Sequence, residues 1–582
     1  MTAYSGAPAF ATLSASMDPS VPPSARPEPS RIAVFGAGIA GLTVAHELAR
    51  RGHRVAVYEA EAVPGGFFRS ERRPEHAGMP SEYSWHGMGP WYHNVFDLLR
   101  QIPYDARGTV YDRALSRPID FGVFPDDAPA RFYDRGLASI PGMFRLRGAQ
   151  WLPWAWLMLK TWTADRRSRE HYARLNAAEA WGRRLDPVAA RTWRACFGPW
   201  VGSDWTRCSL HTAGSFFRKQ LMTRPAHFHA PDEDGPAWWH QAGDGWLLLR
   251  GPSSEVWFDR WVRALGAAGV EFRWSAPLER IDVGGEHVTG AEVGGGERVV
   301  ADWYVLAVTP FAAARILART PELERRSELA RFRPLIQDGP HVQVSFRVAF
   351  GEPVAFPRAR TAVVLADSEF NLTVFAQEQA WRPEVFLGEG VKSLWTGTSC
   401  ASTRPGRLYG IPVEKCTREQ FVAEIRAQIM GCGALDALVR EANGGRGLAD
   451  FGLERIEIWH EWEFSPGGIR HRQPKWVTTT RTQPHQPGQV SGVPNLLLAG
   501  AHTRTAADVW SIEAAVESGR RAARAIDPRV RVVPQHRPAV LRVFGAVDDA
   551  CFRLGLPHVL DLLAGAALGA AVGGIAWAIL GL

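Results

Sequence analysis

The sequence predicts an α/β protein: a Rossmann-type nucleotide-binding domain that is discontinuous in sequence, an inserted α+β substrate domain and a C-terminal apolar helix. Three observations predict this fold class. A glycine-rich turn of the form G-x-G-x-x-G follows a short apolar strand, at residues 36–41. A second strand-to-helix unit begins with the apolar segment 495–499. The last 21 residues, 562–582, carry no charge.

The first unit runs from a strand over 32–35, through a helix, to a second strand that ends at Glu59. Gly36 permits the tight turn, Gly38 lets the backbone approach a pyrophosphate, and Gly41 lets helix and strand pack closely. The N-terminus of the helix directs unpaired N–H groups and a partial positive charge at the phosphates. Glu59 is placed to accept hydrogen bonds from an adenosine ribose. Because all these parts agree in register, they predict a dinucleotide site.

The glycine pair Gly65-Gly66 follows this acid after a five-residue spacer. A nicotinamide dehydrogenase does not need such a pair. The complete spacing resembles the flavoprotein superfamily of amine oxidases and carotenoid desaturases, and this resemblance implies that the segment holds FAD. That superfamily usually has an arginine directly after the glycine pair, whereas this chain has Phe67. Arg69 is the candidate to supply the missing positive charge.

The distal segment also resembles this superfamily. The strand 495–499 ends at Gly500, and a helix is expected from about Ser511. Its N-terminus would direct N–H groups at the negative charge that a reduced flavin develops. The superfamily's C-terminal flavin motif has an acid where this chain has Ala501. His502 and Asp508 are the candidates to replace that contact.

A third segment, 85–94, indicates a subfamily. Its His86, Tyr92 and Asn94 have a spacing similar to that of plant-type carotenoid desaturases. Residues 254–308 resemble the second piece of the FAD domain, in which Leu278 matches a position that meets the adenine. Taken together, the resemblance implies these cofactor-binding residues: Gly36, Gly38, Ala40, Gly41, Glu59, Ala60, Gly65, Gly66, Arg69, Ser70, Gly87, Met88, Gly89, Leu278, Ala307, Gly500, Ala501, Ser511, Ile512 and Ala515.

The expected domain organisation follows from these segments. The Ala/Ser/Pro-rich residues 1–30 are expected to form a disordered leader. The FAD-binding domain is expected to comprise 31–100, 241–310 and 486–526, and the substrate domain 101–240 and 311–485. Residues 527–540 are expected to form a linker, and 541–582 a C-terminal helical membrane anchor or docking helix.

The uncharged run 562–582 would just span a hydrocarbon core of ~30 Å at about 1.5 Å per residue. Gly565, Gly569 and Gly573 repeat at four-residue spacing, a small-residue face that favours close helix packing and a homo-oligomer. Arginines precede this run. They predict a cytoplasmic protein, peripheral or C-terminally anchored at the inner face of the cell membrane.

Composition excludes several other classes. The net charge is +7, yet there is no basic run with interleaved aromatic residues, so nucleic acid is not an expected partner. The six cysteines form no C-x-x-C motif, which argues against a redox dithiol, a zinc ribbon or an iron–sulfur cluster, and no metal site is predicted. The 24 tryptophans are consistent with an aromatic core, an aromatic-lined tunnel or a membrane-interface belt.

The leading functional hypothesis is an FAD-dependent oxidoreductase, a desaturase or dehydrogenase of a long apolar isoprenoid or polyene, which would pass hydride to flavin N5. The chain has one phosphate-binding glycine motif, so electrons are expected to leave for a quinone or oxygen rather than arrive from a second dinucleotide. The candidates for the catalytic base are His86, His502 and Asp508, because they lie in or beside the cofactor motifs.

Three alternatives stay open. The first is a flavin amine oxidase, a class that typically uses a lysine near flavin N5 with an aromatic pair beside it; Lys392 and Lys475 are the plausible lysines. The second is an FAD-dependent double-bond isomerase or fatty-acyl oxidoreductase. The third is a non-catalytic membrane scaffold with a degenerate flavin site, which Phe67 and Ala501 motivate.

Overall fold

The structure is a computed structural model, and it describes residues 28–84, 86–116, 118–132, 140–222, 245–357, 360–453 and 455–580. The side chains of residues 140, 569 and 571–580 are not described. The predicted leader therefore lies outside the described residues except for 28–30.

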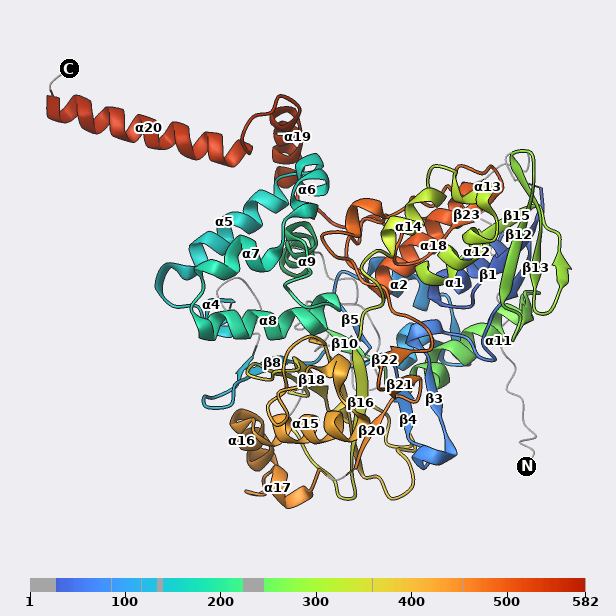
Figure 1. Cartoon of the computed structure of the whole chain (residues 1–582), viewed down its shortest axis with the longest axis horizontal. Helices are drawn as coiled ribbons and strands as arrows, with labels where there is room; N and C mark the ends of the chain where they lie inside the picture. Colours follow the sequence, from blue (N-terminus) through green and yellow to red (C-terminus); the bar gives the residue numbers. More distant parts are fainter. Residues whose placement is uncertain are drawn as a thin grey trace.

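A five-stranded parallel sheet forms the nucleotide-binding part of the molecule, in the strand order β11-β2-β1-β15-β23 (Figure 1). Its strands are β1 (Arg31–Phe35), β2 (Arg54–Tyr58), β11 (Glu271–Arg273), β15 (Trp303–Leu306) and β23 (Leu496–Leu498). Strands from three distant parts of the chain thus pair in one sheet, as a discontinuous domain requires. The domain limits themselves stay a prediction.

Two helices that pack on this sheet place the cofactor motifs together. They are α1 (Ile39–Ala49) and α18 (Ile512–Ile526). A Cβ on Gly519 of α18 would lie 2.6 Å from the Ala40 carbonyl oxygen of α1, so only glycine permits this approach. The close crossing brings the first and the last motif of the chain side by side.

A mixed seven-stranded sheet forms the second part, in the order β20-β16-β19-β18-β17-β8-β9. Its strands are β8 (Phe121–Phe124), β9 (Arg131–Phe132), β16 (Val344–Phe350), β17 (Ala362–Leu365), β18 (Leu372–Phe375), β19 (Ser393–Ser399) and β20 (Arg455–Ile458). Helices α15 (Arg418–Met430) and α16 (Gly433–Ala442) cover one face (Figure 1). Val344 and Phe346 of the sheet belong to the same apolar cluster as Phe421 of α15.

Helices α5 (Trp151–Trp162), α8 (Pro187–Val201) and α9 (Leu210–Met222) form an aromatic helical layer beside this sheet (Figure 1). Trp193 is fully buried and stacks on Phe144 with ring centroids 3.7 Å apart. Trp154 and Phe217 pack on the same ring. Many of the tryptophans therefore build an aromatic core, one of the three roles that the sequence allowed for them.

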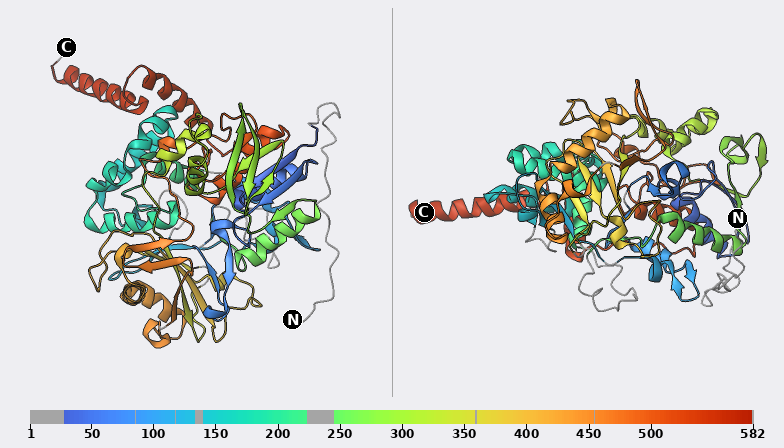
Figure 2. Two further views of the ribbon diagram at one scale, coloured as in Figure 1. Left: turned by 45° about the vertical axis from the view of Figure 1, so that its right-hand side comes forward. Right: turned by 90° about the horizontal axis from the view of Figure 1, so that it is seen from below.

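The C-terminal segment forms α19 (Ala539–Arg553) and α20 (Val559–Leu580), and α20 projects away from the rest of the molecule (Figure 2). Its first turn contacts α5, because Asp561 accepts hydrogen bonds from Trp156 Nε1 at 3.2 Å and Lys160 Nζ at 2.5 Å. Within the described part of the chain, no helix combines the length and apolar character that crossing a bilayer requires. Gly565 is exposed, whereas Gly569 and Gly573 fall outside the described side chains. The membrane anchor and the glycine-mediated homo-oligomer stay predictions.

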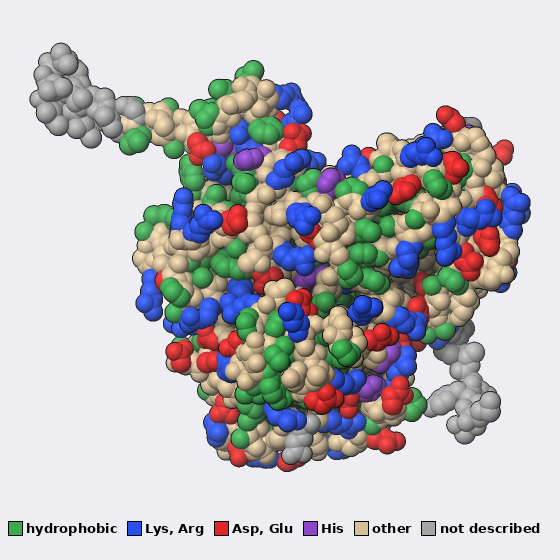
Figure 3. Space-filling view, in the orientation of Figure 1, with side chains coloured by type: hydrophobic (Ala, Val, Ile, Leu, Met, Phe, Trp, Pro, Cys, Tyr) green, Lys and Arg blue, Asp and Glu red, His purple; other side chains and the backbone are tan. Residues whose placement is uncertain are grey.

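The surface charges on the face that Figure 3 shows are mixed. Lys and Arg side chains are spread among acidic ones over the visible face instead of forming one basic band (Figure 3). The net charge of +7 is therefore not concentrated in a single patch on this face.

Candidate functional site

The glycine-rich turn has the geometry that a bound pyrophosphate needs. Gly36 has φ +108°, and a Cβ there would lie 2.5 Å from the Ala307 carbonyl oxygen. A Cβ on Gly41 would lie 1.9 Å from the Gly36 carbonyl oxygen. A Cβ on Gly38, by contrast, would meet no protein atom within 4 Å, so the space beside Gly38 is open to a ligand. The residues present thus fit a dinucleotide.

The glycine pair faces this turn. The Gly65 N–H donates to the Ala37 carbonyl at 2.9 Å, and a Cβ on Gly66 would lie 3.4 Å from Gly38 Cα. Gly65 and Gly66 both have positive φ, at +107° and +55°. The two glycine segments therefore lie against each other, as the sequence spacing implied.

Glu59 already holds the backbone of this site. Its carboxylate accepts from the Ala37 N–H at 2.6 Å and from the Glu61 N–H at 2.9 Å. Burial raises the pKa of Glu59, while these two hydrogen bonds oppose the shift. The neighbouring Ala60 is exposed. Leu278 is half-buried at the start of β12 (Leu278–Gly284), next to Ala276, whose N–H donates to the Glu59 carbonyl at 2.8 Å.

Arg69 and Ser70 are bound within the protein. The Arg69 guanidinium donates to Glu71 at 2.7 Å, to the Gly66 carbonyl at 2.9 Å, and to Glu461. Ser70 Oγ accepts from the Ser254 N–H at 2.9 Å. The charge of Arg69 is thus shared with two carboxylates rather than left free for phosphates.

Phe67, which stands where relatives have arginine, has an aromatic role. Its ring packs edge-on against Tyr83 with centroids 4.9 Å apart. The replacement therefore extends the aromatic surface around Tyr83.

Helix α18 carries the distal motif as predicted. Ser511 caps its N-terminus by accepting from the Ala514 N–H at 3.3 Å, and Ile512 and Ala515 are half-buried in its first turn. Gly500 has φ +148°, and its N–H donates to Ser518 Oγ at 2.8 Å. Ala501 is half-buried beside it.

Glu513 joins the distal motif to the third one. Its carboxylate accepts from the Asn94 N–H at 3.0 Å, Asn94 Nδ2 at 2.9 Å, the Val95 N–H at 3.0 Å and Gln535 Nε2 at 2.7 Å. It thereby caps α2 (His93–Leu99). Before that helix, Gly87 and Met88 form β5, and a Cβ on Gly89 would lie 2.9 Å from Trp91 Nε1.

Glu513→Gln is expected to destabilise the holoprotein by about 1–3 kcal/mol, because an amide group would face donors that now bind a carboxylate. Burial raises the pKa of Glu513 to about 7, so part of the loss is offset by removing a desolvated charge. Urea unfolding measures the effect, and the exposed Glu463→Gln is the control. Equal midpoints for the two variants would show that Glu513 does not hold the motifs together.

The three predicted base candidates do not form one site. His86 is buried, stacks on Phe68 with ring centroids 3.7 Å apart, and has Nδ1 3.1 Å from Glu82 Oε2.

His502 is buried near Phe332, and burial lowers its pKa to about 3. Asp508 lies 3.6 Å from His211 Nε2. Although burial acts to raise it, the charges of His211 and Lys219 hold the pKa of Asp508 well below its usual range. Neither His502 nor Asp508 is tuned as a base near neutral pH.

Lys475 is a buried amine beside the residue that precedes the cap of α18. Its Nζ lies 4.5 Å from the centroid of the Trp510 ring, directly before Ser511, and 5.6 Å from the Tyr83 ring. The same Nζ donates to Gln343 Oε1. Burial lowers the pKa of Lys475 to about 7. Lys392, the other lysine that the sequence suggested, is exposed and therefore wrong as a candidate.

Gln343 links Lys475 to a polar face of the seven-stranded sheet, because its Nε2 donates to Cys400 Sγ, which also contacts Thr398 Oγ1. Ser345 and Thr398 are register partners, as are Thr373 and Thr398, so their side chains share one face. All three are fully buried, and the hydroxyls of Ser345 and Thr373 have no hydrogen-bond partner. Buried hydroxyls normally find a partner, so this face can bind the polar groups of a ligand or water. The sequence showed the alternation of these strands but not which face meets Lys475.

Two further groups escaped sequence reasoning. Lys219 is buried, donates to the Ala507 carbonyl at 2.5 Å, and has a pKa that burial lowers to about 7. Among the described residues, Glu71, His460 and Glu461 could also hold a metal ion, but Arg69 binds both carboxylates. The sequence gives the position of Lys219 along its helix, but that position does not indicate that the side chain is buried.

Comparisons with known proteins agree with this geometry. The family model of flavin containing amine oxidoreductases matches residues 39–356 and 462–527. The zeta-carotene desaturase of Solanum lycopersicum is 36% identical over 74 residues, a match that spans 12% of this chain and only 12% of that protein.

Solved structures share the fold. A putrescine oxidase variant has a TM-score of 0.58 at 15% identity and covers 86% of this chain and 99% of its own. Cyclohexylamine oxidase from Brevibacterium oxydans has a TM-score of 0.53 at 16% identity, covering 86% and 98%. An oxidoreductase from Methanosarcina mazei has a TM-score of 0.52 at 14% identity, covering 84% and 98%. Because the family model spans more than half of the chain and the glycine motifs fit a dinucleotide, this protein belongs to the flavin-containing amine oxidoreductases and uses FAD as its cofactor.

Proposed function

We propose that the protein oxidises an amine, removing hydride from the carbon beside the nitrogen. The observation that carries the proposal is the position of Lys475, buried between the Tyr83 and Trp510 rings at the start of α18. A buried lysine with an aromatic pair is the arrangement that the amine oxidase hypothesis requires. The polar sheet face supports the same substrate class, because a purely hydrocarbon chain would leave its hydroxyls unpaired.

The side chains around Lys475 can prepare such a substrate. An alkylammonium must lose a proton before its C–H bond can be oxidised, and neutral Lys475 can accept that proton at Nζ. Gln343 Oε1 holds Nζ in place, and the two aromatic rings can bind the apolar part of the substrate and exclude water. FAD, when bound, supplies the hydride acceptor. Oxygen or a quinone is the final acceptor that we propose, on the basis of the single glycine motif.

Anaerobic mixing of the holoenzyme with a panel of amines and a panel of polyenes tests this function. We expect the flavin absorbance to bleach with at least one amine and with none of the polyenes. Bleaching by polyenes alone would refute amine oxidation.

A second candidate is desaturation of a long apolar isoprenoid. It is favoured by the 74-residue match to the zeta-carotene desaturase and by the spacing of His86, Tyr92 and Asn94. A membrane-dissolved substrate would also suit the C-terminal anchor and the inner-membrane location that the sequence predicts. The same two panels separate this candidate from the first.

A further inference from the structure

Two adjoining hollows lie along the segment 504–508 that joins Gly500 to α18. The inner hollow has a volume of about 360 Å³ and the outer one about 680 Å³. Both are lined by Arg504, Ala506, Arg521 and Gln535, so they meet along this segment. Neither is lined by any residue of the glycine-rich turn or the glycine pair. They therefore form a pocket separate from the predicted pyrophosphate site.

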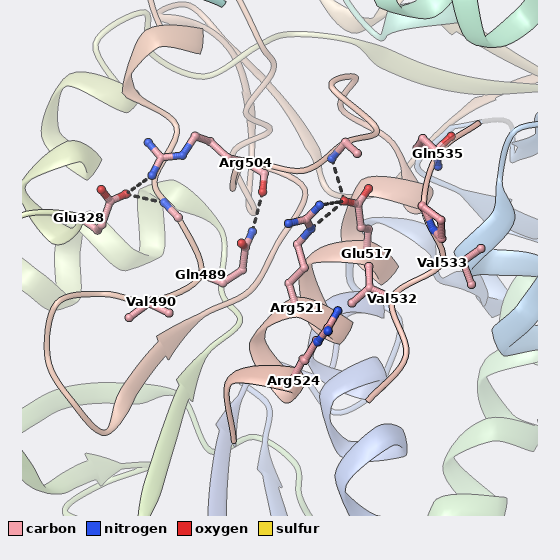
Figure 4. A pocket seen from close by; sticks show the side chains of 13 residues that line it. Glu328, Gln489, Val490, Arg504, Glu517, Arg521, Arg524, Val532, Val533 and Gln535 are labelled. Carbon is pink, nitrogen blue, oxygen red and sulfur yellow. Dashed lines mark hydrogen bonds and ion pairs between the residues drawn. The ribbon is translucent and has the colours of Figure 1, made fainter. Parts of the chain in front are cut away.

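The inner hollow is strongly basic. Five arginines line it against two aspartates. One of these aspartates, Asp165, is bound by Arg537, and the other, Asp508, lies 3.6 Å from His211 Nε2. In the outer hollow, Arg504 binds Glu328 and Arg521 binds Glu517 (Figure 4). Figure 4 draws no contact from Arg524. Protein carboxylates thus neutralise only part of the positive charge.

Arg218 is a desolvated arginine of the inner hollow, and Asp508 and Asp165 act on its charge only at a distance. It is half-buried on α9 and lines the inner hollow, and no carboxylate of the described residues lies within ion-pair distance of it. Its Nε is buried and has no hydrogen-bond partner. An unpaired guanidinium in such a position is costly unless a ligand anion completes it.

We propose that the Arg218 pocket binds a phosphate or diphosphate group. The planar guanidinium presents paired N–H donors that match phosphate oxygens, and the exposed Arg169 adds a second positive charge to the lining. The volume of the joined hollows admits the rest of a phosphorylated molecule. This inference holds whichever substrate the flavin site oxidises.

Calorimetric titration of the holoenzyme with inorganic diphosphate, at constant ionic strength, tests the proposal. We expect saturable binding that Arg218→Gln weakens about tenfold or more, whereas the exposed Arg54→Gln leaves it unchanged. In buffer without phosphate, Arg218→Gln should melt at the same or a higher temperature than the wild type, because it removes an unpaired buried charge. Equal diphosphate affinity in Arg218→Gln and the wild type, or no saturable binding, would overturn the proposal.

A second titration separates the two sources of such a group. Farnesyl diphosphate that binds about tenfold tighter than inorganic diphosphate would identify a lipid-like phosphate ester, and equal affinities would identify a free anion. If Arg218→Gln does not fold, Arg169→Gln serves in its place. It must then weaken diphosphate binding for the proposal to stand.

Discussion

Lys475→Met is expected to slow the anaerobic reduction of the flavin by an amine substrate about 10²–10⁴-fold, the usual contribution of a positioned acid–base group. Methionine keeps the unbranched apolar stem of the side chain but removes the amine that faces Trp510 and Tyr83. The flavin spectrum and the melting temperature should change little, because the buried amine is a cost to folding as well as a functional group. Stopped-flow absorbance measures the rate.

The pH dependence of the same rate gives a second readout. Burial lowers the pKa of Lys475 to about 7, so the side chain is protonated below that pH and neutral above it. Only the neutral amine accepts a proton, so flavin reduction should rise with pH through about 7. In Lys475→Met this rise should vanish. A slow variant that keeps the wild-type profile would assign the titration to another group.

Two lysines serve as controls for Lys475. Lys392→Met removes an exposed amine and should leave the rate unchanged. Lys219→Met removes an equally buried amine, with a pKa also lowered to about 7, but one that lies beside Asp508 and Ala507. If Lys219→Met rather than Lys475→Met abolishes flavin reduction, the reaction site lies beside Lys219.

The contrast between Lys392 and Lys475 shows what the sequence could not predict. Both lysines stand in the substrate part of the chain, and nothing in their neighbours distinguishes them. Burial decides between them, and burial depends on strands that come together from distant segments. The same holds for Glu513 and Asn94, which are 419 residues apart and yet share a hydrogen bond.

The glycine motifs, by contrast, were predictable because their constraints are local. Gly36 needs a positive φ, and Gly41 must fit against the carbonyl of Gly36. Both requirements therefore depend on residues that are close together in the sequence. The role of Arg69 was not predictable in this way. Its partner Glu461 is 392 residues away in the sequence, so no local pattern could predict that contact.

The base candidates stay predictions, but the surroundings of two of them disfavour the role for a related reason. His502 and Asp508 were chosen for their proximity in sequence to the flavin motif. Proximity in sequence does not determine protonation. Burial lowers the pKa of His502 to about 3, and the charges around Asp508 keep its carboxylate ionised. Both side chains can instead stabilise the conformation of segment 500–510, because His502 packs near Phe332 and Asp508 accepts from Ser215 Oγ.

Two neighbouring glycines are expected to respond differently to the same added methyl group. In Gly41→Ala the Cβ would lie 1.9 Å from the Gly36 carbonyl oxygen, so the turn must open, at a cost of more than about 3 kcal/mol. In Gly38→Ala the Cβ would meet no protein atom within 4 Å, and φ is −72°, which alanine adopts freely. We therefore expect Gly41→Ala to yield little folded protein and Gly38→Ala to fold normally.

The position of the Gly38 methyl group makes this pair a test of the cofactor site. It would occupy the space through which the pyrophosphate approaches the backbone, so Gly38→Ala should bind FAD about tenfold or more weakly while its apoprotein melts like the wild type. Fluorescence titration of the apoprotein with FAD gives the affinity, and Gly266→Ala, whose Cβ also meets nothing within 4 Å, is the control. Wild-type FAD affinity in Gly38→Ala would place the pyrophosphate elsewhere. A lower melting temperature of its apoprotein would mean that Gly38 is needed for the fold rather than for the ligand.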